Sequence, residues 1–183
     1  SALFGDGEGG FFFAPADAAD LLVRRKELYD GAIPSGNAVA VLNLLRLGRM
    51  TGDARLEETA LKAARVLSGP AGRAPSSHAF FLVAVDFLLA PPFEVVIAGD
   101  PAAADTQEMI AEFGRLYLPH AVVLLRPPDG EVLAEIAPFT AGMTPLRGRA
   151  TAYVCSGFAC QEPAVGIGGL RDRLREAGLL SAD

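Results

Sequence analysis

The sequence is poor in several residue types that carry specialised chemistry. Its 183 residues include no tryptophan, three tyrosines, two histidines and two cysteines, and the lysines are Lys26 and Lys62 alone. No His, Cys and carboxylate side chains stand at the spacing of zinc ligands, so we expect neither a metal nor a cofactor. Arginine far outnumbers lysine, a bias typical of a GC-rich genome. We expect a bacterial source.

The patterns of a membrane or nucleic-acid-binding protein are also missing. The most apolar segment, Ala79–Ala90, contains Asp86 and is shorter than the roughly 20 residues that cross a bilayer. The sequence shows no secretory signal peptide, which would have a basic start followed by an apolar core. We therefore expect a cytoplasmic location. A net charge of −6 repels phosphate backbones. The basic cluster at residues 171–175 includes an aspartate and indicates a solvated helix face. We expect no nucleic-acid or membrane partner.

Hydrophobic residues make up 51% of the chain and charged residues 21%, which indicates a packed protein. The first half has helical periodicity. A first helix follows a cap at Ser35–Asn37 and ends near Gly52, a second runs from Asp53 to a breaker at 68–70, and a third runs from Ser76 or Ser77 to the prolines at 91 and 92. Before them, residues 10–14 look extended and 21–29 fit a strand or a helix. Short connections predict antiparallel neighbouring helices, as in a hairpin-built bundle or toroid.

In the second half the periodicity changes. An apolar run at 93–98, a helix at about 105–118 and a second run at 121–125 predict a βαβ unit with parallel strands. A third strand is expected at 151–155 and a last helix at about 168–177. The predicted fold class is thus α+β or mixed, with helical hairpins followed by a small α/β lobe that holds a mainly parallel three-stranded sheet.

Short motifs spread along nearly the whole chain match, in order, the sequence pattern of a known protein family. They are Gly9–Phe13, Arg25–Glu27, Tyr29–Asn37, Arg46-Leu47, Thr51–Asp53, Ser77–Ala79, Tyr153–Cys155, Phe158–Cys160 and Pro163. In this order they resemble the YyaL-like proteins, the thioredoxin-domain family that includes the spermatogenesis-associated members. The run Asp-Gly-Ala-x-Pro-Ser-Gly-Asn that starts at Asp30 is the most specific of them.

The resemblance implies an N-terminal thioredoxin-like domain followed by a helical toroid of the six-hairpin glycosidase type. This chain would be the C-terminal part, with the last toroid hairpins at 1–91 and the terminal α/β lobe at 92–183. Because the chain opens on Ser1-Ala2-Leu3 without Met, we expect an excised fragment with a cloning remnant. Its expected partners are the missing N-terminal remainder, with the thioredoxin-like domain and the other hairpins, and a second copy that covers exposed apolar surface.

The loop Asp30–Asn37 is the first candidate for a site. It could place Asp30, Ser35 and Asn37 at the mouth of a toroid pocket, where carboxylate and amide groups bind sugar hydroxyls. Asp30 would then act as a general acid or base. The alternative is a helix-entry loop in which Asp30 binds backbone N–H groups and Ser35 or Asn37 caps the helix.

Glycoside hydrolysis needs two carboxylates about 5–10 Å apart. Glu27 and Asp30 are candidates by proximity, and Glu8 is a third, with Glu27 also a candidate for substrate binding. His78, at the start of a helix, is a second candidate acid or base near neutral pH, or else a first-turn side chain at the rim. His120 precedes a strand and is expected in a turn.

Cys155 and Cys160 form a C-x4-C pair, which is not the C-x-x-C of disulfide oxidoreductases. Ser156 and Gly157 could turn the chain and bring the sulfurs together as a redox or disulfide pair. For a cytosolic protein, two reduced and partly buried thiols are the favoured interpretation.

Two functions remain open. In the first, the parent protein's toroid binds or converts a carbohydrate-like molecule, as a glycosidase- or epimerase-like enzyme only when intact, and this fragment is inactive alone. In the second, the chain is a structural module that closes the toroid and docks a thioredoxin-like domain or another protein. A deep pocket ringed by polar residues favours the first, and an apolar docking face on the α/β lobe favours the second.

Overall fold

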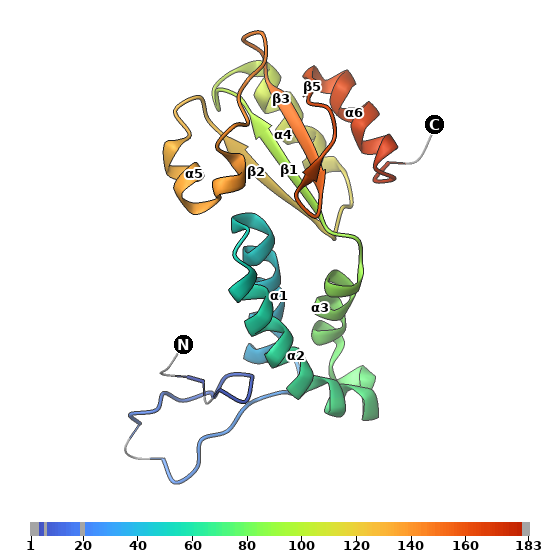
Figure 1. Ribbon diagram of the computed structural model, residues 1–183. Coiled ribbons are helices and arrows are strands. Elements are labelled where there is room, and N and C mark those ends of the chain that lie inside the picture. Colours follow the sequence, from blue (N-terminus) through green and yellow to red (C-terminus); the bar gives the residue numbers. More distant parts are fainter. Residues whose placement is uncertain (1–3, 6, 19–20, 181–183) are drawn as a thin grey trace. The chain divides into compact units, whose positions relative to one another are not determined.

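The protein is described here by a computed structural model, shown in Figure 1. It describes residues 4–5, 7–18 and 21–180, so the opening residues 1–3, on which the expected cloning remnant rests, lie outside the described part. The chain divides into two compact units. One comprises Ser1–Gly48 and Asp53–Ala90, and the other comprises Arg49–Gly52 and Pro91–Asp183.

The first unit is helical. Its elements are α1 (Gly36–Thr51), of which residues 49–51 are grouped with the second unit, α2 (Ala54–Arg73), the 3-10 helix η1 (Pro75–Ser77) and α3 (Ala79–Leu89). Small side chains dominate the buried positions of α2, four of which are alanine. Gly48 of α1 faces α2 so closely that a Cβ there would lie 2.6 Å from Cγ of Glu57. The two helices therefore pack closely because glycine and alanine leave room for backbone approach.

The turn between α1 and α2 follows the sequence prediction. Gly52 has φ +74°, the left-handed conformation that glycine adopts without strain at a helix C-terminus. Asp53 then caps α2, because its carboxylate accepts a hydrogen bond from the N–H of Arg55 at 3.0 Å.

Two local expectations for this unit are wrong. The helix α2 continues through Pro70 to Arg73, because a proline so near the last residue removes a single hydrogen bond and the Pro70 carbonyl still accepts from Ala74 N at 3.1 Å. Residues 21–29 form neither strand nor helix. Residues 10–14, predicted to be extended, belong to no strand of a sheet, and Phe13 N donates to the Arg25 carbonyl at 2.8 Å.

The second unit is built on a mixed sheet. Its strands are β1 (Phe93–Ala98), β2 (Ala121–Arg126), β3 (Thr151–Ser156), β4 (Ala159–Cys160) and β5 (Ala164–Val165), and its helices are α4 (Ala104–Arg115), α5 (Glu131–Ile136), the 3-10 helix η2 (Pro138–Thr140) and α6 (Gly166–Glu176). The strand order is β2-β1-β3-β4, and β5 also pairs with β3. The parallel pair β1–β2, joined through α4, confirms the predicted βαβ unit, and the mixed fold class is confirmed with it.

The sheet is not mainly parallel, however, because β3 pairs antiparallel with β1, as β4 and β5 do with β3. β3 starts at the edge where β2 ends, since Ala98 of β1 pairs with both Arg126 and Thr151. Between β2 and β3 the chain forms the six-residue helix α5, the 3-10 helix η2 and irregular segments, and it does not return along the sheet.

Alternate residues of the central strand β1 pack into two different apolar clusters. Val95 and Ile97 pack in a cluster with Met109 of α4 and Leu170 and Leu174 of α6. Val96 and Ala98 lie in the other, together with Met143, Tyr153 and Cys155. This alternation is what a strand covered on both faces requires. Among the described residues, no helix is long and apolar enough to span a membrane.

Candidate functional site

Asp30 is buried in the first unit and binds backbone on both sides. Its Oδ1 accepts from the N–H of Ser35 at 2.8 Å, and its Oδ2 accepts from the N–H of Phe81 at 3.0 Å. The N–H of Asp30 in turn donates to the carbonyl of Ser77 at 2.9 Å. The carboxylate thus connects the loop before α1 to the first turn of α3, which is the backbone-binding arrangement weighed against the catalytic one.

The side chains of Ser35 and Asn37 also form hydrogen bonds with backbone groups. The Oγ of Ser35 accepts from the N–H of Ala38 at 3.1 Å, so Ser35 caps α1. The side-chain amide of Asn37 accepts from Phe11 N at 2.6 Å and donates to the carbonyls of Phe11 and Glu27, each at 2.8 Å. Asn37 therefore fixes two preceding segments against the start of α1.

His78 lies immediately before α3 and is 5% exposed. Its Nδ1 is 2.9 Å from the carbonyl of Ala74, and its ring meets that of Tyr29 edge-on, with centroids 6.4 Å apart. The predicted position at a helix start is therefore confirmed, but the ring is buried and is not at an exposed rim.

A pocket of about 390 Å³, the aromatic pocket, lies beside these contacts in the first unit. Its lining residues are Phe4, Phe11, Phe12, Phe13, Glu27, Gly36, Asn37 and Ala40. The ring of Phe12 makes cation–π contacts with two side chains, since Arg24 Cζ lies 4.0 Å and Lys26 Nζ 4.9 Å from the ring centroid. Glu27 is the sole ionisable residue of the lining. Within the described residues, its carboxylate has no hydrogen-bond or ion-pair partner.

A second pocket of about 420 Å³ is lined by Asp30, Gly31, Ala32, Pro34, Ser76, Ala79, Phe80 and Val83. The structure therefore brings Glu27 and Asn37 together in the aromatic pocket and places Asp30 in a different one. Ser35 and His78 line neither of these two pockets. In the part of the chain that the structure describes, no group of three or more His, Cys, Asp or Glu residues is placed to hold a metal ion.

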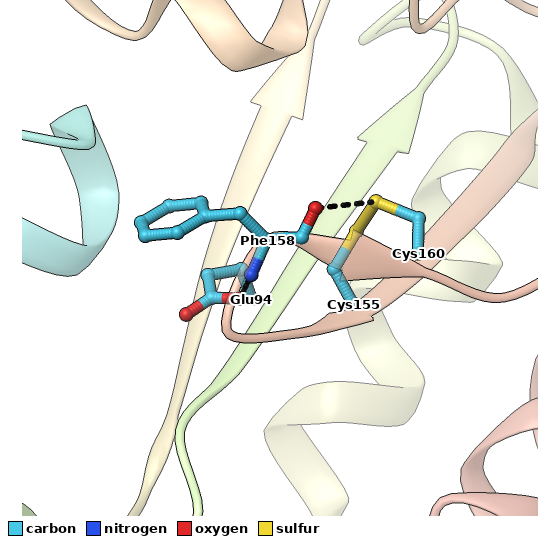
Figure 2. The surroundings of a disulfide bond; sticks show 4 residues. All are labelled: Glu94, Cys155, Phe158 and Cys160. Carbon is cyan, nitrogen blue, oxygen red and sulfur yellow. Dashed lines mark hydrogen bonds between the residues drawn. A yellow bond between two sulfur atoms is a disulfide. The ribbon is translucent and has the colours of Figure 1, made fainter.

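The two cysteines lie in a hairpin of the second unit, formed by β3 and β4. Cys155 and Cys160 are directly opposite each other in the ladder and are joined by a disulfide (Figure 2). The connecting residues Gly157 and Phe158 have φ of 56° and 66°, as a tight two-residue hairpin turn requires. The favoured interpretation as two reduced thiols is thus wrong for this structure, because the turn brings the sulfurs to bonding distance.

The disulfide closes a small ring, since the cysteines are five positions apart. In the chain-entropy model, closing a ring this small raises the free energy of unfolding by about 2 kcal/mol, compared with about 4.7 kcal/mol for a ring of about 100 residues. It therefore constrains the unfolded chain much less than a bond between distant segments would.

The sequence prediction missed Glu94, which anchors this hairpin. Glu94 is fully buried in β1, and its Oε2 accepts from the N–H of Phe158 at 3.0 Å (Figure 2). The signal that could have found it is a single carboxylate within an apolar strand, because a buried carboxylate needs a hydrogen-bond donor.

His120 lies elsewhere in the second unit. It lines a pocket of about 450 Å³ together with Pro91, Phe93, Tyr117, Leu118, Pro119, Ala177, Gly178 and Leu179. It follows Pro119 and precedes β2, in the turn that the sequence predicted.

No protein-family model matches the chain. Among curated proteins it is similar to spermatogenesis-associated protein 20 of three mammals. It is 33% identical to the human protein and 32% identical to the rat protein over 164 residues, which are 88% of this chain and 21% of each relative. It is 31% identical to the mouse protein over 157 residues, 85% of this chain and 20% of the relative.

The mammalian relatives overturn the expectation of a bacterial source. An excess of arginine over lysine does not determine lineage. The chain spans about a fifth of the length of the curated relatives it matches, so its homologues are larger proteins that carry the name spermatogenesis-associated protein 20.

Proposed function

We propose that the first unit supplies a binding site for a small carbohydrate-like molecule to a larger protein, and that this chain alone catalyses no reaction. The observation that carries the proposal is the aromatic pocket. It combines phenylalanine rings with the Glu27 carboxylate, which has no other partner among the described residues. Ligand sites of small molecules have this composition, with apolar walls and a few polar groups that orient the ligand. A sugar offers C–H faces to the rings and hydroxyl groups to the carboxylate.

In this proposal Glu27 orients the ligand, and Asn37 shapes the site. All the polar atoms of the Asn37 amide are engaged with backbone groups, so it holds Phe11 in the wall. Asp30 and His78 receive no catalytic role, because their side chains bind backbone groups. Hydrolysis would need a second carboxylate about 5–10 Å from Glu27, supplied by the rest of the larger protein.

The larger protein belongs to the same proposal. We infer that this chain is a C-terminal piece, that its helices are hairpins of a toroid, and that the remainder covers them. Supporting this, several large apolar side chains of the helical unit are more than a third exposed. They are Leu47 at 46%, Leu61 at 37%, Leu82 at 43%, Val83 at 51% and Leu89 at 77%. Exposed apolar residues of this number suit a surface that meets another segment, or a second copy when that segment is missing.

The second candidate is a structural or interaction module, and the hydrogen bonds of the Asp30–Asn37 loop favour it. Asp30, Ser35 and Asn37 each use their side chains to hold this chain's own backbone. A loop with that role needs no ligand to explain its residues. Under this reading the aromatic pocket would be filled by a segment of the larger protein.

A thermal-shift screen against a panel of sugars and amino sugars separates the two candidates. We would compare this chain and a longer protein that contains it, each with Glu27→Gln and with Glu58→Gln, an exposed glutamate of α2, as the matched control. A ligand at 100 times its dissociation constant adds about 2.7 kcal/mol of stability. A shift in the wild type and in the control that is lost in Glu27→Gln supports the site. No shift with any sugar in either protein would leave the structural module as the function.

A further inference from the structure

The hairpin that carries the disulfide is held by contacts that do not depend on it. The N–H of Phe158, at the turn, donates to the buried carboxylate of Glu94 at 3.0 Å. The Phe158 ring packs edge-on against Phe139, with centroids 5.1 Å apart. Past the disulfide, the N–H of Gln161 donates to the Val154 carbonyl at 2.9 Å. These contacts fix both ends of the hairpin, so it can keep its shape with the disulfide open.

The two sulfurs differ in their surroundings. Cys155 is 1% exposed and packs in an apolar cluster with Val96, Tyr153 and Met143. Cys160 lies on the short outer strand β4 and is exposed. An incoming thiolate can therefore approach Cys160 from solvent, whereas Cys155 is covered. Access decides which sulfur of a disulfide is attacked.

We infer that Cys155–Cys160 is a reversible thiol–disulfide exchange site, in which Cys160 is the attacked sulfur and Cys155 the resolving one. The co-reactant is a small thiol of the glutathione class. Its thiolate attacks Sγ of Cys160 and forms a mixed disulfide, while the bond to Cys155 breaks and Cys155 leaves as a thiolate that takes a proton from water. A second thiol then attacks the mixed disulfide, which releases the Cys160 thiol and the oxidised small disulfide. Two electrons pass from the two small thiols to the protein disulfide.

The reverse reaction follows from the same geometry. A mixed disulfide on Cys160 lies directly opposite Cys155 in the ladder. Intramolecular attack by a group held at bonding distance is strongly favoured over attack from solution. Cys155 therefore expels the bound thiol and restores the disulfide. The mixed disulfide is short-lived in the wild type and persists where Cys155 is absent.

The first experiment uses Cys155→Ser and Cys160→Ser, each checked by circular dichroism and then incubated with oxidised glutathione. Mass spectrometry follows the added glutathione. We expect Cys155→Ser to gain a stable adduct on Cys160 at least about tenfold faster than Cys160→Ser gains one on Cys155. Equal rates, or faster reaction at Cys155, would overturn the assignment of the attacked sulfur.

The second experiment uses the wild-type chain and does not depend on whether the variants fold. The chain is equilibrated with mixtures of reduced and oxidised glutathione, quenched with an alkylating reagent and analysed by mass spectrometry, while circular dichroism monitors the fold. We expect a graded conversion between the disulfide and dithiol forms, an unchanged spectrum and alkylation at Cys160 before Cys155. A bond that millimolar glutathione opens only in denaturant, or a chain that unfolds when the bond opens, would make the disulfide a structural staple and refute the proposal.

Discussion

The side-chain amide of Asn37 pairs with the backbone of Phe11 as a neighbouring strand would, accepting from its N–H at 2.6 Å and donating to its carbonyl at 2.8 Å. Gly10, just before, has φ +72°, and a Cβ there would lie 3.1 Å from Oδ1 of Asn37. One buried residue at the start of α1 thus determines where the irregular segment before the helices runs. It also positions Phe11, which lines the aromatic pocket.

Replacing Asn37 by alanine should therefore destabilise the first unit and release this segment. The change removes three partly buried hydrogen bonds with the backbone of Phe11 and Glu27, so we expect a loss of about 2–3 kcal/mol in the free energy of unfolding. Denaturant titration measures that loss, and hydrogen exchange of the Phe11 amide measures the release. Asn43→Ala, at an exposed position of the same helix, is the matched control and should cost less than about 0.5 kcal/mol. Equal effects of the two changes would contradict the assigned role.

Asp30 is expected to act through stability as well. An asparagine at this position presents one acceptor oxygen and one NH₂ group, so one of the two N–H groups of Ser35 and Phe81 would face a donor. We expect Asp30→Asn to lower the free energy of unfolding by about 2 kcal/mol, measured by urea titration. Asp17→Asn, at an exposed turn position, should have little effect. If Asp30→Asn keeps full stability and abolishes ligand binding in the longer protein, the catalytic or binding hypothesis for Asp30 holds instead.

The parts of this fold that the sequence predicts are those set by neighbouring residues. The cap at Ser35, the glycine turn at Gly52 and the capping of α2 by Asp53 each depend on a few consecutive positions. The parallel pair β1–β2 follows from two apolar runs separated by one amphipathic helix. Local chemistry and periodicity are sufficient for such elements.

The parts that could not be predicted depend on contacts between distant residues. Asn37 meets Phe11 across 26 positions, and Glu94 meets Phe158 across 64. The direction of β3 is determined by the irregular stretch after β2, where no periodic pattern indicates which way the chain returns. Polar residues such as Asp30 suit a catalytic loop and a capped turn equally well, and only their hydrogen-bond partners distinguish the two.

The stability of the second unit should depend on pH through Glu112. Its carboxylate lies between α4 and α6 and is bound by Arg171 through Nε at 2.6 Å and Nη2 at 2.9 Å. The hydrogen bonds from Arg171 hold the pKa of the Glu112 carboxyl below its usual range, against the opposing effect of burial. A lowered folded-state pKa stabilises the fold above the unfolded value of 4.5, and this contribution is lost as the pH falls through the folded-state pKa.

Arg171→Gln should therefore lower the free energy of unfolding at neutral pH by about 1–2 kcal/mol. We expect a moderate value because the Arg171 side chain is 46% exposed. In addition, Nη1 of Arg115 remains 3.8 Å from Oε2 of Glu112. Urea titrations of both proteins between neutral pH and about pH 3 test this, since the difference should shrink as Glu112 is protonated. Arg175→Gln, which removes an exposed pair on the same helix, is the control. A difference that stays constant with pH would show that Arg171 acts by packing and not through the Glu112 charge.

Arg126 is expected to be the opposite case, a charged residue whose removal stabilises the protein. It ends β2 and is 7% exposed, and Nη2 donates to the Ala141 carbonyl at a long 3.3 Å. Its Nε and Nη1 are buried, and no described residue supplies a hydrogen bond or a carboxylate to them. The free energy lost by removing this guanidinium from water exceeds the stabilisation that the packing of its side chain provides. Arg126→Met should therefore raise the free energy of unfolding by about 1–2 kcal/mol.

The measurement is urea titration of Arg126→Met beside Arg65→Met, which makes the same change at an exposed position of α2 and should shift stability by less than about 0.5 kcal/mol. A gain at Arg126 alone would identify its guanidinium as a source of instability in the second unit. A loss of about 1 kcal/mol or more would mean that Nε and Nη1 are satisfied in solution, by ordered water or a bound anion, because removing one member of a satisfied buried pair is costly. Repeating the titration with added phosphate then separates these two, since a bound anion would stabilise the wild type and leave Arg126→Met unchanged.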